Sequence, residues 1–199
     1  MTNPLIEAIK KRRTQYALGK NLPLSVEDTT DLIKEAVRHA PSSFNSQSSR
    51  VIILFGKESE TFWSLTRETL RKIVPADAFG PTAEKMKAFA AGAGTVLFFE
   101  DQDVIKELQE KFPLYADNFP IFSEHSAGMA QFAVWSALAN AGIGASLQHY
   151  NPLIDAQVAE AWNVPSSWSL RAEMPFGSHE KPLPEKTFID DDTRFRVFA

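Results

Sequence analysis

The segment from residue 126 to residue 154 contains no Asp, Glu, Lys or Arg, and this restricts the fold more than any other feature. It is long enough to cross a bilayer, but its apolar residues are mostly alanine, whereas a membrane span is rich in Leu, Ile and Val. We therefore expect no membrane association. Small side chains recur at helical spacing and allow another backbone to approach closely: Ala130, Ala133, Ala137 and Ala141. A helix without a charged face has no side to present to water. The stretch from about Ser123 to Ala141 is thus predicted to be a helix buried on all sides, either central in one core or partly covered by a partner subunit.

Length, charge and cysteine content limit the function. A chain of 199 residues can bury a sizeable core in one domain, so a single domain over 1–199 is expected. The net charge of −4 argues against nucleic acid as the main partner, because phosphate neutralisation needs a basic face. The absence of cysteine excludes a thiolate nucleophile and a thiol redox pair, so a redox function would need a bound cofactor. The N-terminus has no apolar signal-peptide core, which favours a cytoplasmic protein.

Helical and apolar patterns alternate along the chain. Asn3 before Pro4 predicts one helix start, and Ser25 with Asp28 resembles a capping box at a second. Short apolar runs predict buried strands at 51–55, 95–99, 145–147 and 170–174. These patterns favour helices packed on a mostly buried sheet. The tail 182–199 has no helical period and is expected to form an extended arm, with 190–192 in a solvated turn.

Two short polar motifs lie near the start of the chain. The first, Lys11-Arg12-Arg13-Thr14, follows a predicted helix, and the planar fork of Arg suits a phosphate group. The second runs from Ala40 to Gln47 and contains Ser, Asn and Gln, whose side chains donate and accept as the edge of a heteroaromatic ring demands. Each motif alone is typical of a solvated helix end or an ordinary loop. Together they indicate a phosphorylated, flat, polar-edged cofactor similar to a flavin.

Motifs for other chemistries are missing. The sequence contains no phosphate-binding P-loop and no G-x-S-x-G nucleophile elbow. Gly142-Ile143-Gly144 lacks a third glycine and follows a helix, so a dinucleotide-binding fold is not expected. The four histidines show no metal-ligand spacing. Neither a metal site nor a catalytic side chain is predicted.

The chain resembles the nitroreductase family of FMN-dependent oxidoreductases over nearly its full length. The matching elements are the helix ending in Arg12-Arg13-Thr14, the run 40–47, the long central helix, Gly142-Ile143-Gly144-Ala145 with the following residues 146–151, and the basic C-terminal arm. The stretches 12–18 and 146–152 are similar to one branch of small bacterial and fungal nitroreductases. Members of that branch are associated with stress responses and with reduction of compounds such as 4-nitroquinoline N-oxide.

The resemblance implies an α+β sandwich with a central mixed sheet flanked by helices, assembled as a homodimer with a C-terminal extended arm. Two FMN sites would lie at the subunit interface. Cofactor-binding residues on one side of the site would be Arg12, Arg13, Thr14, Gln148, His149 and Lys186. The other subunit would supply Ser42, Ser43, Asn45 and Gln47. The segment at Gln148 and His149 would pass along the flavin ring with a backbone N–H directed at N5.

The chain departs from the family pattern at two positions. Many members carry a basic residue where this chain has Tyr16, and a second basic residue where it has Phe188. Arg194 or Arg196 would then supply the missing phosphate contact. Lys85 or Lys87 would supply the positive charge that stabilises a reduced flavin.

The resemblance implies an FMN-dependent NAD(P)H oxidoreductase with a ping-pong mechanism. NADH or NADPH would be the electron donor, and a nitroaromatic compound or quinone the small-molecule acceptor. The cofactor would carry the chemistry, so no catalytic side chain is assigned. Two alternatives stay open: a flavin-binding stress or regulatory protein with incidental turnover, and an α/β domain without a cofactor.

Overall fold

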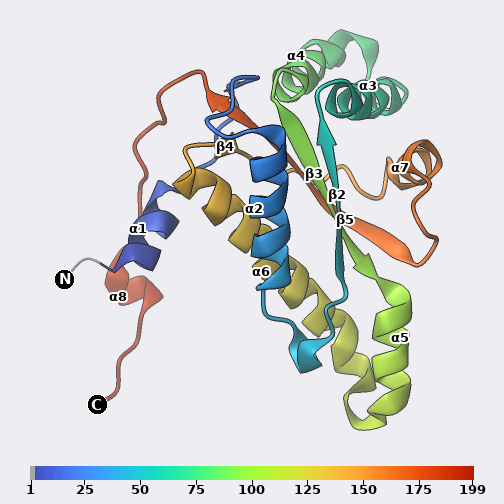
Figure 1. Ribbon diagram of the computed structural model, residues 1–199, viewed down its shortest axis with the longest axis vertical. Helices are drawn as coiled ribbons and strands as arrows, with labels where there is room; N and C mark the ends of the chain where they lie inside the picture. Colours follow the sequence, from blue (N-terminus) through green and yellow to red (C-terminus); the bar gives the residue numbers. More distant parts are fainter. Residues whose placement is uncertain (1–2) are drawn as a thin grey trace.

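The computed structural model describes residues 3–199 and contains one five-stranded sheet within them (Figure 1). The strands are β1 (Leu18–Gly19), β2 (Ser49–Phe55), β3 (Gly94–Asp101), β4 (Gly144–Ala145) and β5 (Trp168–His179). Their order is β1-β5-β3-β2, and β4 also pairs with β5. The last strand in the sequence is therefore the central one, in contact with three others.

The predicted mixed sheet is wrong, because each strand pair within residues 3–199 is antiparallel. Parallel pairing occurs at an isolated bridge between Thr14 and Ala145. The connection between β2 and β3 explains the direction. It contains two helices, α3 (Lys57–Arg71) and α4 (Phe79–Ala90), which run in opposite directions. The chain therefore reverses direction between β2 and β3, and β3 pairs antiparallel with β2.

Helices cover both faces of the sheet (Figure 1). One face carries α2 (Val26–Arg38) and α6 (Phe119–Asn140), and α1 (Pro4–Lys11) packs on α6. The other face carries α3, α4 and α7 (Asp155–Trp162). The remaining helices are α5 (Gln102–Lys111), α8 (Asp191–Arg194) and the 3₁₀ turns Ser43–Asn45, Ala76–Ala78 and Pro113–Asn118.

Side-chain caps fix several helix starts. Asn3 accepts from the N–H groups of Leu5 and Ile6, and Ser25 accepts from Asp28 N–H, as their sequence patterns predict. Asp101 accepts from the N–H of Asp103 at the start of α5. These caps fix the residues at which α1, α2 and α5 begin.

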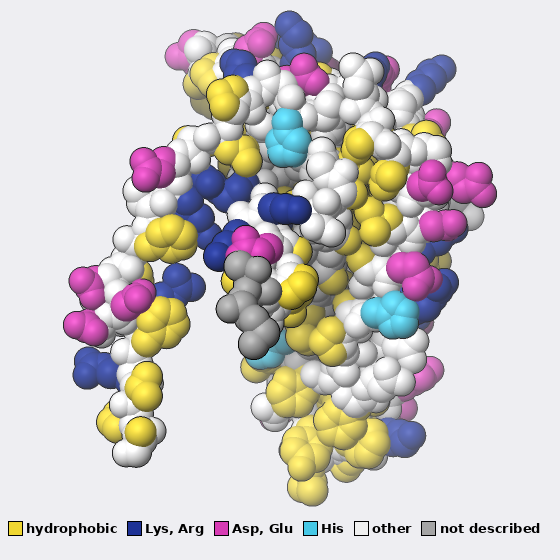
Figure 2. All heavy atoms as spheres, turned by 60° about the vertical axis from the view of Figure 1, so that its left-hand side comes forward, with side chains coloured by type: hydrophobic (Ala, Val, Ile, Leu, Met, Phe, Trp, Pro, Cys, Tyr) yellow, Lys and Arg dark blue, Asp and Glu magenta, His cyan; other side chains and the backbone are white. Residues whose placement is uncertain are grey.

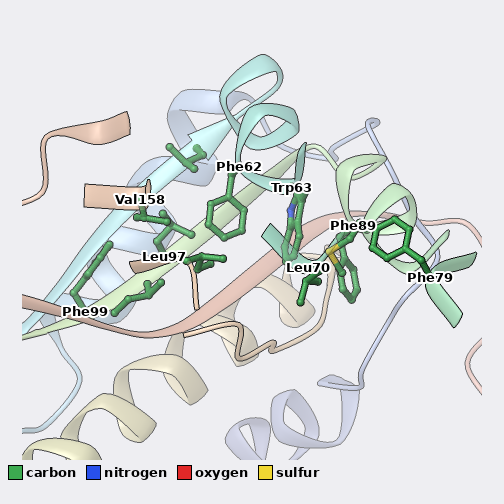
Figure 3. Packing of buried hydrophobic residues seen from close by; sticks show 12 residues of the cluster. Phe62, Trp63, Leu70, Phe79, Phe89, Leu97, Phe99 and Val158 are labelled. Atoms are coloured by element: carbon green, nitrogen blue, oxygen red, sulfur yellow. The ribbon is translucent and has the colours of Figure 1, made fainter. Parts of the chain in front are cut away.

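The face under α3, α4 and α7 is packed with aromatic side chains (Figure 3). Phe62 and Trp63 meet edge to face with ring centroids 4.9 Å apart, and Trp63 lies 4.7 Å from Phe89. The indole N–H of Trp63 donates to Thr95 Oγ1 at 2.8 Å. Residues of this chain alone bury this core.

The other face of the sheet, under α2 and α6, is less fully covered by this chain. Ile33, Val134 and Leu138 are buried against the sheet, but Met129 and Phe132 of α6 are 38% and 43% exposed. The prediction that α6 is buried on all sides is therefore wrong within one chain. An apolar hollow of about 550 Å³ runs along its exposed side and is lined by residues of α1, α2 and α6. Within residues 3–199, no helix combines the length and apolar character needed to span a membrane.

The chain after β5 forms an arm that stands away from the body (Figure 1). The predicted extended conformation holds for most of it, and the solvated turn predicted at 190–192 is confirmed as the exposed start of α8. Asp190 accepts from Asp192 N–H and caps the single helical turn α8. A short polar side chain before a turn stabilises its free N–H groups, which explains why the turn forms here.

Candidate functional site

A hollow of about 640 Å³ separates the C-terminal arm from the body, and Lys and Arg side chains gather there (Figure 2). We call it the arginine hollow. Its lining includes four of the predicted cofactor residues, Arg12, Arg13, Thr14 and Lys186. These residues lie far apart in the sequence, and the arm brings them together. The volume is typical of a small-molecule site.

Backbone pairing positions the first three of these residues. Helix α1 ends at Arg12, whose extended ψ of 107° directs the chain toward β4. Thr14 forms a bridge with Ala145, and Gln15 N–H donates to the Ala145 carbonyl at 2.9 Å. The 12–15 segment is therefore fixed against the edge of the sheet.

The arm is held by hydrogen bonds to that same segment. The Arg13 guanidinium donates to the carbonyl of Pro184 at 2.7 Å, and Gln15 Nε2 donates to the carbonyl of Lys181 at 2.8 Å. Lys186 follows shortly afterwards and extends over the ring of Phe188, 4.9 Å from its centroid. The basic groups from the two ends of the chain thus face one hollow.

Arg12 sits in an environment that favours an anionic ligand. Its guanidinium lies 4.4 Å above the ring of Trp135, and burial together with the neighbouring Arg13 lowers the pKa of Arg12. Among residues 3–199, no carboxylate forms an ion pair with Arg12 or Arg13. Two adjacent cations without a counter-charge repel each other, so binding of an anion would stabilise the pair.

A second hollow, of about 400 Å³, shares Arg12 with the first. Its other lining residues come from α6 and the strand edge: Gly128, Gln131, Phe132, Trp135 and Leu147. The buried indole Nε1 of Trp135 has no hydrogen-bond partner within residues 3–199. An unpartnered buried N–H is rare in native structures, and a bound ligand is one of the partners that explains it. Cations, a free N–H donor and an adjoining mostly apolar hollow fit a phosphorylated aromatic group such as FMN.

The second sequence motif lies elsewhere on the chain. Ser42 and Gln47 line a separate hollow of about 320 Å³, together with basic residues of α2 and β2. Ser43 and Asn45 form the 3₁₀ turn inside the same loop. Within one chain, the structure does not bring this loop into the arginine hollow.

The remaining predicted residues are scattered. Gln148 is buried, its backbone pairs with Glu173 in both directions, and its amide donates to Ser146 Oγ at 3.1 Å, whereas His149 is exposed. Arg194 and Arg196 are not among the residues that line the arginine hollow. Of the positions weighed for the flavin ring, Tyr16 lines that hollow, and Lys87 lines a different one between α3 and α4.

The 42–47 loop lies beside an aromatic cluster. Phe44 is half exposed and lies 4.9 Å from Phe112, 5.2 Å from Phe119 and 6.0 Å from Tyr115, measured between ring centroids. The cluster joins the loop to α5 and to the start of α6. Its exposed rings could stack on a flat aromatic molecule.

Sequence reasoning missed Trp135 and two buried carboxyl groups. Glu100 on β3 accepts hydrogen bonds from three serine hydroxyls. Glu173 on β5 accepts from the N–H of Tyr150, but its other oxygen has no partner among residues 3–199. Burial, with a further contribution from Asp155, raises the pKa of Glu173 to about 8. The signal available in the sequence was an acidic residue next to an apolar run, Glu100 at the end of one strand and Glu173 inside another.

The chain is similar to known proteins in sequence and in fold. A family model described as the nitroreductase family matches residues 9–178. The Saccharomyces cerevisiae protein HBN1 is 35% identical over 189 residues, which cover 94% of each chain. The nitroreductase CinD from Lactococcus lactis, solved with chloramphenicol, is 49% identical with a TM-score of 0.90 and covers 98% of this chain and 99% of its own. A Desulfovibrio desulfuricans protein solved with FMN shares the fold at 19% identity, with a TM-score of 0.71 and coverage of 100% and 99%.

Proposed function

This chain belongs to the nitroreductase family, and from that premise we propose that it is an FMN-dependent oxidoreductase that uses NADH or NADPH to reduce nitroaromatic or quinone-type acceptors in a ping-pong sequence. The proposal includes a role in stress defence, in keeping with the branch that the sequence resembles. FMN, when bound, supplies the hydride acceptor and donor that amino-acid side chains lack.

The arginine hollow is the observation that carries this proposal. Arg12, Arg13 and Lys186 offer positive charge, and Thr14 offers a hydroxyl. Among the described residues, none of these three cations forms an ion pair with a carboxylate. A phosphate monoester is the group that satisfies such a donor set best. In this proposal these four residues hold the phosphate and ribityl end of FMN.

The remaining predicted residues are given binding and orienting roles. Gln148 is fixed by its backbone pairing with Glu173, so it would present a rigid strand to the flavin ring. His149 is exposed beside it and would border the acceptor. Ser42, Ser43, Asn45 and Gln47 would act from the partner subunit. Arg194 and Arg196 would approach the phosphate through movement of the arm.

The homodimer is part of the proposal. Two features of one chain support it: the apolar hollow along α1, α2 and α6, and the separation of the two predicted halves of the flavin site. A second copy placed against α6 would cover Met129 and Phe132. Large exposed apolar patches with polar rims are typical of protein interfaces.

An aromatic acceptor is favoured by two further facts. CinD has been solved with chloramphenicol and with 4-nitrophenol. In this chain, the half-exposed Phe44 and Tyr115 offer ring faces beside the 42–47 loop. The alternative of a flavin-binding regulatory protein differs only in turnover, so rapid flavin reduction by NAD(P)H and reoxidation by 4-nitrophenol would favour the enzyme.

Arg12→Ala tests the cofactor site. Removing one charged partner of a buried ion contact costs about 2–5 kcal/mol, so the variant should bind FMN tens- to thousands-fold more weakly while staying folded. FMN affinity is measured by flavin fluorescence, and folding by circular dichroism. Arg71→Ala is the matched control, because Arg71 also lies over an aromatic ring but pairs with Glu68 and lines neither the arginine hollow nor the hollow at Ser42 and Gln47. Equal flavin affinity in both variants would place the phosphate elsewhere.

A further inference from the structure

Glu100 lies at the end of β3 and is completely buried. Its Oε2 accepts from Ser48 Oγ at 2.6 Å and from Ser123 Oγ at 2.7 Å, and its Oε1 accepts from Ser49 Oγ. A buried carboxyl group is costly unless hydrogen bonds satisfy it. Here three hydroxyls do so, and they come from two different parts of the chain.

The first part is the end of the 42–47 loop. Ser48 directly follows the loop, and Ser49 is the cross-strand partner of Glu100 in the β2–β3 ladder. The Ser48 carbonyl also accepts from Asp101 N–H at 3.0 Å. Glu100 and Asp101 thus fix the point at which the loop enters the sheet.

The second part is helix α6. Ser123 donates to Glu100, and Ser126 lies one turn further along the same helix. Ser126 Oγ accepts from the N–H of Ser43 at 3.3 Å, near the start of the loop. Through α6, the same carboxyl group is therefore connected to both ends of the loop.

The loop between these two anchors has an unfavourable backbone. Phe44, Asn45 and Gln47 have φ values of 55°, 51° and 49°, in the left-handed region that L-residues rarely adopt. Within the loop, Gln47 N–H donates to Ser42 Oγ at 2.9 Å. Such conformations persist only where surrounding contacts determine them, and they cluster at binding sites.

We propose that Glu100 is a positioning residue that holds the 42–47 loop, through Ser48, Ser49 and Ser123, in the strained conformation with which it contacts its ligand. That the ligand is FMN rests on the proposed function above. The loop-holding role itself concerns residues of this chain alone.

The chain offers a matched control for a merely structural role. Thr95 lies on the same strand and is also buried, and its Oγ1 accepts from Trp63 Nε1 at 2.8 Å and shares a hydrogen bond with Ser59 Oγ at 2.7 Å. This second cluster faces α3, on the side of the sheet opposite to the loop. Thr95→Val should therefore lower stability without changing the loop.

The test compares Glu100→Leu, Ser123→Ala, Glu100→Gln and Thr95→Val by hydrogen exchange of the amides of residues 43–47 in the full chain, with FMN affinity as a second measurement. Because loss of a buried hydrogen-bond acceptor corresponds to about tenfold or more in an equilibrium, Glu100→Leu should speed loop exchange and weaken FMN binding at least that much. Ser123→Ala should give a smaller change in the same direction. Glu100→Gln retains an acceptor oxygen and should stay within about threefold of the native chain. Thr95→Val should leave both measurements unchanged.

The outcomes separate the two proposals. Loop exchange in Glu100→Leu that matches Thr95→Val would overturn the positioning role, whatever happens to flavin. If Glu100→Leu does not fold, Ser123→Ala decides, and unchanged loop exchange in that variant would also overturn it. A native chain that does not bind FMN, with a loop still released by Glu100→Leu, would refute the proposed function and support the positioning role.

Discussion

The two faces of the sheet differ in how fully one chain covers them. Under α3, α4 and α7, aromatic rings interlock, and the buried hydroxyls and the Trp63 indole are hydrogen bonded (Figure 3). Under α1, α2 and α6, apolar side chains stay exposed, and Trp135 Nε1 and Ser136 Oγ have no partner within residues 3–199. The first face stabilises the fold. The second presents exposed apolar side chains, which are typical of a binding surface, whereas buried polar atoms without a partner occur on both faces, for example Asp155 Oδ1 on α7.

The largest effect is expected from a charge on the open face. Ala137 lines the apolar hollow, so Ala137→Glu would place an unpaired carboxylate in the proposed interface, twice in a symmetric dimer. An uncompensated buried charge costs about 3–5 kcal/mol, so the variant should be monomeric or aggregated and should lose flavin. Analytical ultracentrifugation and flavin absorbance measure this. The control is Ala156→Glu, at an exposed position of α7 on the other face. A monomeric Ala137→Glu protein that binds FMN tightly would show that one chain builds the whole site.

A core truncation on the closed face should affect folding and little else. Phe62 is completely buried, and Phe62→Ala should lower the free energy of unfolding by about 3–5 kcal/mol. Phe132→Ala, on the open face, should cost a single chain far less, because Phe132 is 43% exposed. Denaturant unfolding at fixed protein concentration gives both values. Similar losses for the two variants would remove the distinction between the faces.

The unpartnered carboxyl group of Glu173 should make stability depend on pH. Burial raises its pKa from an ordinary 4.5 to about 8, and burial also raises that of the nearby Asp155. Between pH 4.5 and about pH 8, the unfolded chain has released the Glu173 proton, whereas the folded chain retains it. Unfolding then releases a proton, so stability falls as pH rises from about 5 to about 8, by at most about 1.4 kcal/mol per pH unit for one group.

Thermal unfolding of the native chain and of Glu173→Gln across this range tests the prediction. The glutamine cannot ionise, so the variant should show a flatter pH profile and should be more stable than the native chain at pH 8. Asp155→Asn is the companion variant, because it removes the neighbouring carboxyl group but leaves Glu173. A pH profile that is the same in all three proteins would mean that Glu173 is ionised in the folded chain at neutral pH.

The sequence predicted those features that depend on local chemistry. The caps at Asn3 and Ser25 follow from side chains that bond backbone groups two or three residues away. Strands β2 and β3 include the apolar runs 51–55 and 95–99 that predicted them. The expectation that Lys186 and Arg12 share a site came from the family resemblance alone, because no local signal joins residues so far apart, and both line the arginine hollow.

The features that were missed depend on tertiary contacts. Glu100 looks like a strand end in the sequence, and only the fold brings Ser48 and Ser123 to it. The prediction of an uncharged helix overlooked Glu124, which lies on α6 and pairs with Arg171, and composition does not state which side of a helix the same chain covers. The sheet direction was misjudged for a related reason, since it depends on how α3 and α4 pack together.

The central position of β5 determines when this protein can fold during its synthesis. Strands β1, β3 and β4 all pair with β5, yet β5 ends at His179, close to the end of the chain. Of the strand pairs described above, a ribosome-bound chain that lacks β5 can form only the β2–β3 ladder. Sheets dominated by such distant pairings form slowly, and incomplete ones aggregate. The sheet of a nascent chain therefore stays incomplete until His179 has left the ribosome.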